Sequence, residues 1–425
     1  MTRYNVLILP IGTEIGLEIY RALRYSKHFH TFGISSDDNN HGRFLCGENY
    51  TKENVPTFND EAFWDKLSII INRYEIDFIY PASPLLFDVL HLNLNDKIKE
   101  KIILPNFETV TICRSKKLTY LTFESNLKVP LLSEKESRHL TSEDYPIFLK
   151  PERGQGTSNC HVVKNKDELG IFSRLVEDPL LLKYIEGPEY TVDCFTDKHG
   201  KLRFVGARIR NRIKNGISVN TVSVDNERFK IIADKINSVL EMRGGWFFQV
   251  KGNDELYLLE IEPRIAGTSG TWRQVGVNLP LLTLYDKIGH DVEIQINDCS
   301  IELDRALKAR FKTNLKYNNV YVDLDDTLIL NNKVNTELVA FLYQCKNEKK
   351  RLFLITKNAF AINQLRKYCI DSALFDEIII SDNKKDSMKN FPAIFIDDSF
   401  GERQEVSKIG VPVFDLDAIE CLRRG

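Results

Sequence analysis

Acidic residues follow short apolar runs in the last quarter of the chain. The run "VYV" ends in Asp323, with Asp325 two residues later; "LFLI" ends in Thr356; "IFI" ends in Asp397 and Asp398. In a parallel sheet the carboxyl ends of neighbouring strands lie at one edge, where such sheets bind ligands. We therefore expect these five side chains to share one pocket. Carboxylates gathered in this way require a cation, and hard oxygen ligands suit Mg²⁺.

Two adjacent lysines, Lys384 and Lys385, precede the last of these runs and are able to reach the same edge. The sequence does not decide between them, and we favour Lys385. The alternative to a shared site is that acidic residues end three strands by chance.

The order of these residues resembles the haloacid dehalogenase phosphatases: "DLDDT" is similar to their D-x-D-x-T motif and is followed by a threonine, a lysine and "DD". The resemblance implies that Asp323 is the nucleophile, and that Asp325 protonates the leaving group and later activates water. Thr356 and a lysine, Lys385 in our choice, would then hold phosphate oxygens. The metal site that the resemblance implies consists of Asp323, Asp325, Asp397 and Asp398.

The intervals between these motifs have room for little beyond one helix each. Many phosphatases of this kind carry an inserted cap domain that encloses a small substrate. We therefore expect residues 320–425 to form a capless three-layer α/β domain. Its site would be open to a large substrate, or covered by the rest of the chain.

A second cluster of oxygen ligands lies in "FFQVKGNDELYLLEIEPR". Glu260 and Glu262 are two residues apart in a predicted strand, so both side chains leave the same face. If the turn of the hairpin centres near Asp254, Gln249 lies opposite Glu260. Two carboxylates and an amide oxygen suit Mg²⁺ bound to ATP phosphates. The alternative is a solvated strand face, which does not explain why "EIEPR" ends an apolar strand.

The segment "YPIFLKPERGQGTS" has the composition of a phosphate-binding loop. Lys150 ends an apolar strand, and Gly154, Gly156, Thr157 and Ser158 follow. Glycines let backbone N–H groups approach a phosphate, hydroxyls add donors, and a lysine adds a charge. A polar hairpin with a surface lysine is the equally simple alternative.

Other residues complete a predicted nucleotide site. In "LLLKYIEGPEY" an apolar strand precedes a Gly–Pro break, so adenine would stack on the strand. The backbone at Tyr184 and Ile185 would then bind the edge of the adenine ring, and Glu189 would bind the ribose hydroxyls. Alternate arginines in "GARIRNRIKNGIS" share a face of a strand, where they would clamp a γ-phosphate or an acyl phosphate or form a solvated basic edge. These arginines are Arg208, Arg210 and Arg212.

The order of segments up to about residue 305 resembles the ATP-grasp superfamily, especially its carbamoyl-phosphate-synthase-like and carboxylate–amine ligase branches. Two positions depart from the family pattern: Glu262 replaces an asparagine of E-x-N-P-R, and Leu182 replaces a frequently acidic residue before Lys183. The resemblance assigns Lys116 and Lys150 to the phosphates and residues 154–158 to a mobile lid. It assigns residues 183–185 and Glu189 to adenosine. It makes Gln249, Glu260 and Glu262 the metal ligands, with Arg264 beside them. The cofactors that it implies are ATP and Mg²⁺, with Mn²⁺ as a substitute.

Elements able to position these residues are visible in the sequence. Near the N-terminus, apolar runs alternate with amphipathic stretches, which indicates parallel α/β layering. From about residue 111, hairpins are expected, pairing 180–185 and 189–195 with 201–210, and 245–250 with 256–263. We predict an α/β and α+β multidomain protein. It would begin with a Rossmann-like pre-ATP-grasp domain (1–110), followed by a two-lobed ATP-grasp domain (111–307) with subdomains A (about 111–185) and B (about 186–307). A linker (308–319) would lead to the phosphatase-like domain (320–425).

Composition excludes several classes of protein. Hydrophobic residues make up 43% and charged residues 28% of the 425, and the formal net charge is −2. This balance is typical of a globular protein and gives no overall field that attracts nucleic acid or membrane. No apolar run approaches the roughly 20 residues of a membrane span. The eight cysteines form no C-x-x-C pair, which favours free thiols and a cytoplasmic location.

The sequence therefore predicts a bifunctional enzyme. One part would join small-molecule carboxylates and amines by way of an acyl phosphate, with glycan or cell-surface precursors among the candidate substrates. The other would hydrolyse a phosphorylated compound of the same pathway. A homodimer fits the family. The alternatives are a small-metabolite kinase with an editing phosphatase, or one domain that serves only as a regulatory or binding module.

Overall fold

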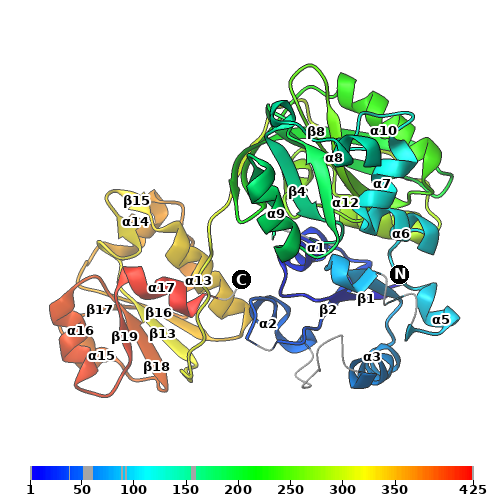
Figure 1. The fold of residues 1–425 in the computed structure, drawn as a ribbon. Coiled ribbons are helices and arrows are strands. Elements are labelled where there is room, and N and C mark those ends of the chain that lie inside the picture. The colour runs from blue at the N-terminus through cyan, green and yellow to red at the C-terminus, as the bar shows by residue number, and fades with distance from the viewer. Residues whose placement is uncertain are drawn as a thin grey trace. The chain divides into compact units, whose positions relative to one another are not determined.

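The computed structural model describes residues 2–37, 39–50, 61–87, 90, 93–154 and 159–423. The chain forms two compact units, Met1–Leu307 and Lys308–Gly425, which are blue to yellow-green and yellow to red in Figure 1. Each unit has its own hydrophobic cores.

The first unit begins with a three-stranded parallel sheet in the order β2-β1-β3. Its strands and helices follow the predicted alternation. The apolar faces of β1 and β3 pack against α3 through Leu7, Ile79, Leu67 and Ile70. The elements are β1 (Tyr4–Leu9), α1 (Glu14–Leu23), β2 (Phe29–Gly33), α2 (Gly42–Cys46), α3 (Glu61–Arg73), β3 (Phe78–Pro81) and α5 (Asp96–Lys99).

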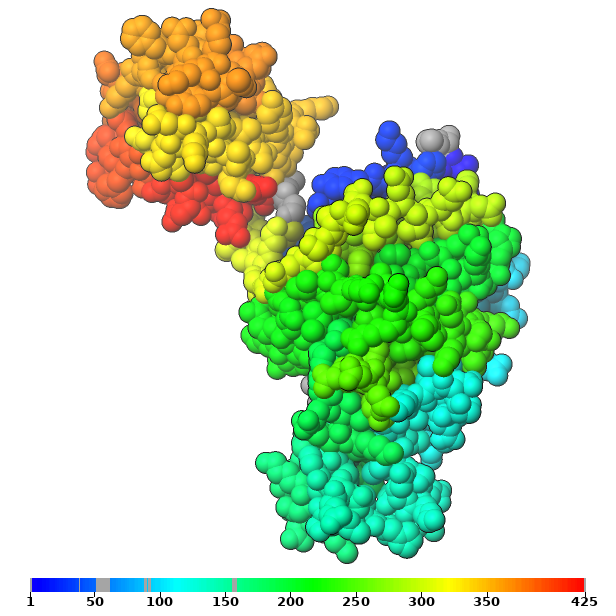
Figure 2. Space-filling model, turned by 90° about the horizontal axis from the view of Figure 1, so that it is seen from above, coloured from blue at the N-terminus to red at the C-terminus, as the bar shows by residue number. Residues whose placement is uncertain are grey.

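A small antiparallel sheet in the order β5-β4-β6 follows. Figure 2 shows this part of the chain, in cyan to teal, as a lobe that protrudes from the green body of the same unit. The expected pairing of 180–185 with 201–210 is wrong: β6 pairs with β4, with Lys183 opposite Ile147. The chain changes sheets at the Gly187–Pro188 break. The elements are α6 (Phe107–Arg114), α7 (Lys116–Phe123), α8 (Glu134–Arg138), β4 (Ile147–Pro151), β5 (His161–Val163), α9 (Lys166–Leu175) and β6 (Pro179–Lys183).

The body of the first unit is a six-stranded sheet in the order β11-β10-β7-β8-β9-β12. The predicted antiparallel pairs β7–β8 and β10–β11 are present. Helix α10 covers one face, where Phe229 packs among Val192, Trp246 and Phe248. Because side chains alternate along a strand, Gln249 faces the opposite side. The elements are β7 (Glu189–Thr196), β8 (Leu202–Lys214), β9 (Ile217–Ser223), α10 (Glu227–Val239), β10 (Gly244–Lys251), β11 (Tyr257–Glu262), α11 (Gly270–Gln274), α12 (Leu279–Lys287) and β12 (Glu302–Asp304).

The second unit is built on a five-stranded parallel sheet in the order β17-β16-β13-β18-β19. Val320 of β13 faces a core that contains Leu338 of α13, whereas Tyr321 faces a core that contains Val406 of α16, so helices cover both faces. The elements are β13 (Asn319–Val322), β14 (Ile329–Leu330), β15 (Lys333–Val334), α13 (Thr336–Asn347), β16 (Arg351–Thr356), α14 (Ala361–Lys367), β17 (Glu377–Ile380), α15 (Lys384–Ser387), β18 (Ala393–Ile396), α16 (Phe400–Ser407), β19 (Val413–Phe414) and α17 (Ile419–Leu422).

Other expectations concern the chain as a whole. Between Thr327 and Lys384, all of which is described, the structure contains only the β14–β15 hairpin, α13, β16, α14, a short 3-10 turn and β17, and no inserted cap domain. The eight cysteines, all of which are described, form no disulfide bond with one another. Within the described ranges, no helix combines the length and apolar character needed to cross a bilayer.

Two candidate active sites

The predicted oxygen cluster of the first unit forms across the β10–β11 hairpin. Gln249 lies opposite Glu260, and Phe247 lies opposite Glu262. The strand register shifts between Gln249 and Val250, at a bulge on the side of the turn. The shift therefore leaves the pairing of Gln249 with Glu260 and of Phe247 with Glu262 intact. Arg264 lies beside the cluster, with its Nε 3.2 Å from Oε2 of Glu262.

Electrostatics at this cluster favour a bound cation. Burial raises the pKa of Glu262; the guanidinium of Arg264 opposes the rise, and the nearby charge of Glu260 adds to it. In the described part of the chain, the buried Oε2 of Glu262 accepts no hydrogen bond, so its contact with Arg264 lacks hydrogen-bond geometry. A buried carboxylate oxygen without a donor fits a metal ligand, which would offset the charge on both glutamates.

Two lysines face the same region. Lys150 is buried at the end of β4; its Nζ donates to the carbonyl of Leu259 at 3.3 Å and lies 5.3 Å from the ring centre of Tyr120. Burial lowers the pKa of Lys150 to about 8, although the charge of Glu260 opposes this. Nζ of Lys116 donates to the carbonyl of Gly154 at 3.0 Å. Both amino groups are close enough to Glu260 to interact with its charge.

A pocket of about 300 Å³ brings the predicted nucleotide residues together. Apolar side chains such as Phe148, Val162 and Leu182 form part of its wall. The predicted residues Gly156, Thr157 and Ser158 lie outside the described residues. The pocket contains the other predicted nucleotide residues, Lys116, Lys150, Gly154, Lys183, Tyr184, Ile185 and Glu189, together with Gln249 and Glu260.

A second pocket, of about 350 Å³, adjoins the first. The two have four lining residues in common. On its far side the second pocket is lined by the start of α1 and the loop after β3, including Thr13 and Ser83. The residues common to both pockets are Arg210, Gly216, Gln249 and Glu260.

The predicted row of three arginines is only partly realised. Arg208 and Arg210 line the second pocket, but Arg212 points elsewhere and pairs with Asp304 at 2.8 Å. The cause is an irregularity in the β8–β9 register between Arg210 and Arg212, which breaks the alternation.

The two inward arginines are held differently. Arg208 is fully buried and its Nε donates to Asp193 at 2.8 Å, while its two terminal nitrogens have no partner among the described residues. Arg210 pairs with Glu189 and donates to Oε1 of Gln249 at 2.8 Å. Both are therefore fixed at the wall of the second pocket, and among the described residues donor capacity remains on the terminal nitrogens of Arg208 and on Nε of Arg210.

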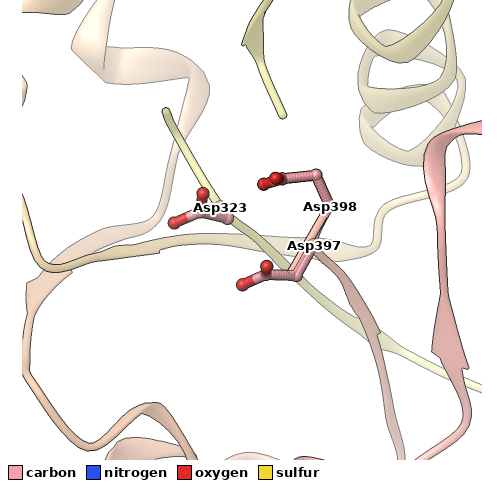
Figure 3. A group of neighbouring side chains, drawn as sticks. All are labelled: Asp323, Asp397 and Asp398. Atoms are coloured by element: carbon pink, nitrogen blue, oxygen red, sulfur yellow. The ribbon is translucent and has the colours of Figure 1, made fainter. Parts of the chain in front are cut away.

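In the second unit, the carboxyl edge of the parallel sheet gathers three of the predicted acids. Asp323 follows β13, and Asp397 and Asp398 follow the neighbouring β18. Their carboxylates turn to the same side (Figure 3), and one oxygen of each lies within 4.8 Å of the others. Three carboxylates so close together fit a divalent cation such as Mg²⁺.

Lys384, rather than Lys385, reaches this cluster. Its Nζ is 2.6 Å from Oδ1 of Asp323 and 2.7 Å from Oδ2 of Asp397. Our preference for Lys385 is wrong in this structure, because Lys385 points outward and lies 3.5 Å from Glu405. The reason is local: both lysines are in the first turn of α15, and successive helical residues diverge by about 100°.

The buried cluster has shifted proton affinities. Burial raises the pKa of Asp323 to about 6, although hydrogen bonding to Lys384 opposes this. Burial likewise raises the pKa of Asp397, against the effect of the same lysine. Burial alone lowers the pKa of Lys384, but its hydrogen bonds and charge interactions with Asp323 and Asp397 raise it overall.

Asp325 and Thr356 take other positions at this edge. Asp325 was expected among the metal ligands, but its carboxylate is held by the side-chain amides of Asn358 and Gln364. Thr356 is buried at the end of β16, where its Oγ1 accepts from the backbone N–H of Asn358 at 3.1 Å. Neither Asn358 nor Gln364 is predicted from the sequence, although an amide two residues after the end of β16 is a signal for Asn358.

Comparison with known protein families gives a match within the first unit. Residues 176–304 match the family model described as "ATP-grasp in the biosynthetic pathway with Ter operon". The comparison with curated protein sequences gave no match.

Solved structures with similar folds cover about 70% of the chain. The biotin carboxylase domain of Hydrogenobacter thermophilus 2-oxoglutarate carboxylase, in complex with MgADP, ADP and bicarbonate, is 16% identical over 70% of this chain and 73% of its own (TM-score 0.58). Biotin carboxylase from Campylobacter jejuni is 19% identical over 69% and 73% (0.55). N5-carboxyaminoimidazole synthetase from Staphylococcus aureus is 15% identical over 70% and 82% (0.54).

These similarities concern the fold and one segment of the first unit. At such low identity the structural matches establish the fold, and the family model identifies the segment that carries Gln249, Glu260 and Glu262. The first unit of the chain therefore contains an ATP-grasp domain.

Proposed function

We propose that residues 1–307 form an ATP-dependent carboxylate–amine ligase that acts through an acyl phosphate. The observation that carries this proposal is the wall common to the two pockets. Lys150 and the apolar wall suit a nucleotide in the first pocket, and Arg208 suits an acid in the second. The γ-phosphate would meet the acid at Arg210 and Glu260, which is the arrangement that phosphoryl transfer to a carboxylate requires.

In this proposal the chain's own residues act mainly by position and charge. Lys116 and Lys150 neutralise the ATP phosphates, and Arg208, Arg210 and Arg264 stabilise the acyl phosphate. Gln249, Glu260 and Glu262 would hold Mg²⁺, which supplies charge neutralisation when bound. The acid attacks the γ-phosphorus and ADP leaves; an amine then attacks the acyl carbon and phosphate leaves.

Product analysis tests the ligase. Purified protein is incubated with ATP, Mg²⁺ and pooled carboxylates, bicarbonate among them, with and without pooled amines. We expect ADP and phosphate release that depends on an acid, a hydroxamate when hydroxylamine is added, and loss of both in Lys150→Ala. A stable phosphoester in place of the hydroxamate would identify a kinase and overturn the ligase.

We further propose that residues 320–425 form a capless, haloacid-dehalogenase-like phosphatase. The observation that carries it is the contact of one buried lysine with two buried aspartates, because Lys384 holds Asp323 beside Asp397 at the carboxyl edge of the sheet. Oδ2 of Asp323 would attack phosphorus and form an aspartyl phosphate. Mg²⁺ held by Asp323, Asp397 and Asp398 would offset the charge of the phosphate.

A single substitution tests this second activity. Asp323→Asn keeps the shape of the side chain but removes the nucleophile. We expect it to abolish Mg²⁺-dependent hydrolysis of p-nitrophenyl phosphate while acid-dependent ADP release by the first unit continues. Unchanged hydrolysis would contradict the role of Asp323.

A further inference from the structure

Two side-chain amides hold the carboxylate of Asp325. Nε2 of Gln364 donates to Oδ1 at 2.8 Å. Nδ2 of Asn358 lies 3.1 Å from Oδ2 and 3.3 Å from Oδ1. Asn358 is in the loop after β16 and Gln364 is in α14, so two successive elements meet at one carboxylate.

The orientation of both amides is determined by their other contacts. Oδ1 of Asn358 accepts from the backbone N–H of Phe360 at 2.8 Å, so Nδ2 must face Asp325. Nδ2 also donates to Oε1 of Gln364 at 2.5 Å, which leaves the amide nitrogen of Gln364 to face Asp325. Neither amide can turn over without losing a donor–acceptor match.

We propose that Asn358 and Gln364 are positioning residues for the acid–base group of the second unit. This inference rests on the proposed phosphatase function and adds residues that the D-x-D-x-T resemblance does not assign. Oδ1 of Asp325 accepts a hydrogen bond from Gln364 at 2.8 Å, whereas Oδ2 has only the 3.1 Å contact with Asn358, whose other amide hydrogen is used by Gln364. Oδ2 is therefore the oxygen with the greater remaining capacity, and it carries the transferred proton.

The proton is moved twice in each turnover. In the first step Asp323 attacks phosphorus, the bond from phosphorus to the leaving oxygen breaks, and that oxygen takes the proton from Oδ2 of Asp325. In the second step water attacks the aspartyl phosphate, Oδ2 takes a proton from the water, and the bond from phosphorus to Asp323 breaks. Both transfers require Oδ2 within hydrogen-bond reach, so a rotated carboxylate slows both.

A substitution of Gln364 tests the positioning of Asp325 without removing a residue proposed to contact the phosphate. Among the described residues, the side chain of Gln364 forms hydrogen bonds with Asp325 and Asn358. Its neighbour Asn363 is also an amide, lies on the exposed face of α14 and offers a matched control. The informative comparison is therefore between Gln364→Ala and Asn363→Ala in the full-length chain.

Leaving-group dependence provides the readout. p-Nitrophenolate departs readily as an anion, whereas phenolate depends on a proton from an acid. In rapid mixing with Mg²⁺, we expect Gln364→Ala to slow the first turnover of phenyl phosphate by at least about tenfold. The first turnover of p-nitrophenyl phosphate should change by less than about threefold. Its later turnovers should be slow, because the variant also activates water poorly for hydrolysis of the aspartyl phosphate. Asn363→Ala should match the unmodified protein with both esters.

Two results would contradict the inference in distinguishable ways. If Asp323→Asn is inactive, an equal loss of hydrolysis rate with both esters in Gln364→Ala, or no loss with either, would overturn the positioning role. Hydrolysis that survives Asp323→Asn would instead overturn the phosphatase proposal on which the inference rests. Asn358→Ala provides a second variant, because it removes the other donor from the loop that precedes α14, and it should show the same preference for the better leaving group.

Discussion

Nζ of Lys384 lies 2.6 Å from Oδ1 of Asp323, and the side chains of both residues are at most 7% exposed. The same nitrogen contacts Asp397 at 2.7 Å. The lysine therefore holds two buried carboxylates together, and its removal leaves them next to each other without a cation.

The first prediction concerns this lysine. Lys384→Met should abolish hydrolysis of p-nitrophenyl phosphate and reduce the free energy of unfolding of the second unit by about 3–5 kcal/mol, because breaking a buried pair leaves uncompensated charge. Steady-state hydrolysis and urea denaturation measure the two effects. Lys385→Met is the control, since its partner Glu405 is 3.5 Å away at the surface. Equal effects of the two substitutions would refute the assignment of Lys384.

The second prediction concerns the metal cluster of the first unit. Glu260→Gln keeps an oxygen but removes a charge, so ADP formation should fall by at least about 100-fold, as is typical when the interactions that stabilise phosphoryl transfer are lost. Saturating Mg²⁺ should restore little of it. Glu255→Gln, in the turn of the same hairpin, is the control, because Glu255 forms an exposed pair with Lys128. Metal-dependent nucleotide binding, followed by fluorescence, would show whether the loss is in binding.

The third prediction separates the arginines of β8. Arg208→Met should reduce the free energy of unfolding of the first unit by about 3–5 kcal/mol, because among the described residues Asp193 is left buried with only the indole N–H of Trp272 as a side-chain donor. Arg212→Met should have little effect, since Arg212 and Asp304 are 60% and 52% exposed. Guanidinium unfolding of both variants makes the comparison. Similar stabilities would show that the buried pair is not needed for folding.

The fourth prediction concerns the lysines around the nucleotide pocket. Lys150→Ala should weaken ATP binding by at least about tenfold, because a charge-assisted contact with phosphate contributes about 1.5–3 kcal/mol. Lys183→Ala should change it little, because that side chain is 49% exposed and pairs with Glu136. Calorimetric titration with a non-hydrolysable ATP analogue measures both. A larger effect at Lys183 would place the phosphates elsewhere.

Periodicity and strand-end chemistry predict much of this molecule. Gln249 lies opposite Glu260 because hairpin register follows from the position of the turn, which the sequence marks with Gly252, Asn253 and Asp254. Asp323 and Asp397 meet because parallel strands bring their carboxyl ends to one edge. Local rules of this kind need no knowledge of distant contacts.

The errors arise where tertiary contacts decide. Lys384 and Lys385 have the same type and the same local sequence, and only the packing of α15 selects the one that turns inward. Arg212 leaves the row of arginines because of a register irregularity that alternation cannot reveal. Gln364 reaches Asp325 from a helix that follows a different strand, so no local spacing connects the two.

The wall common to the two pockets of the first unit also limits how its selectivity can be altered. Arg210, Gln249 and Glu260 face both pockets, so in the proposed ligase we expect a substitution at any of them to change the apparent Michaelis constants of ATP and of the acid together. Thr13 and Ser83 face the second pocket alone. In the proposed ligase, a redesign that exchanges one acid for another while sparing the nucleotide therefore begins from residues that line the second pocket alone, of which these two are examples.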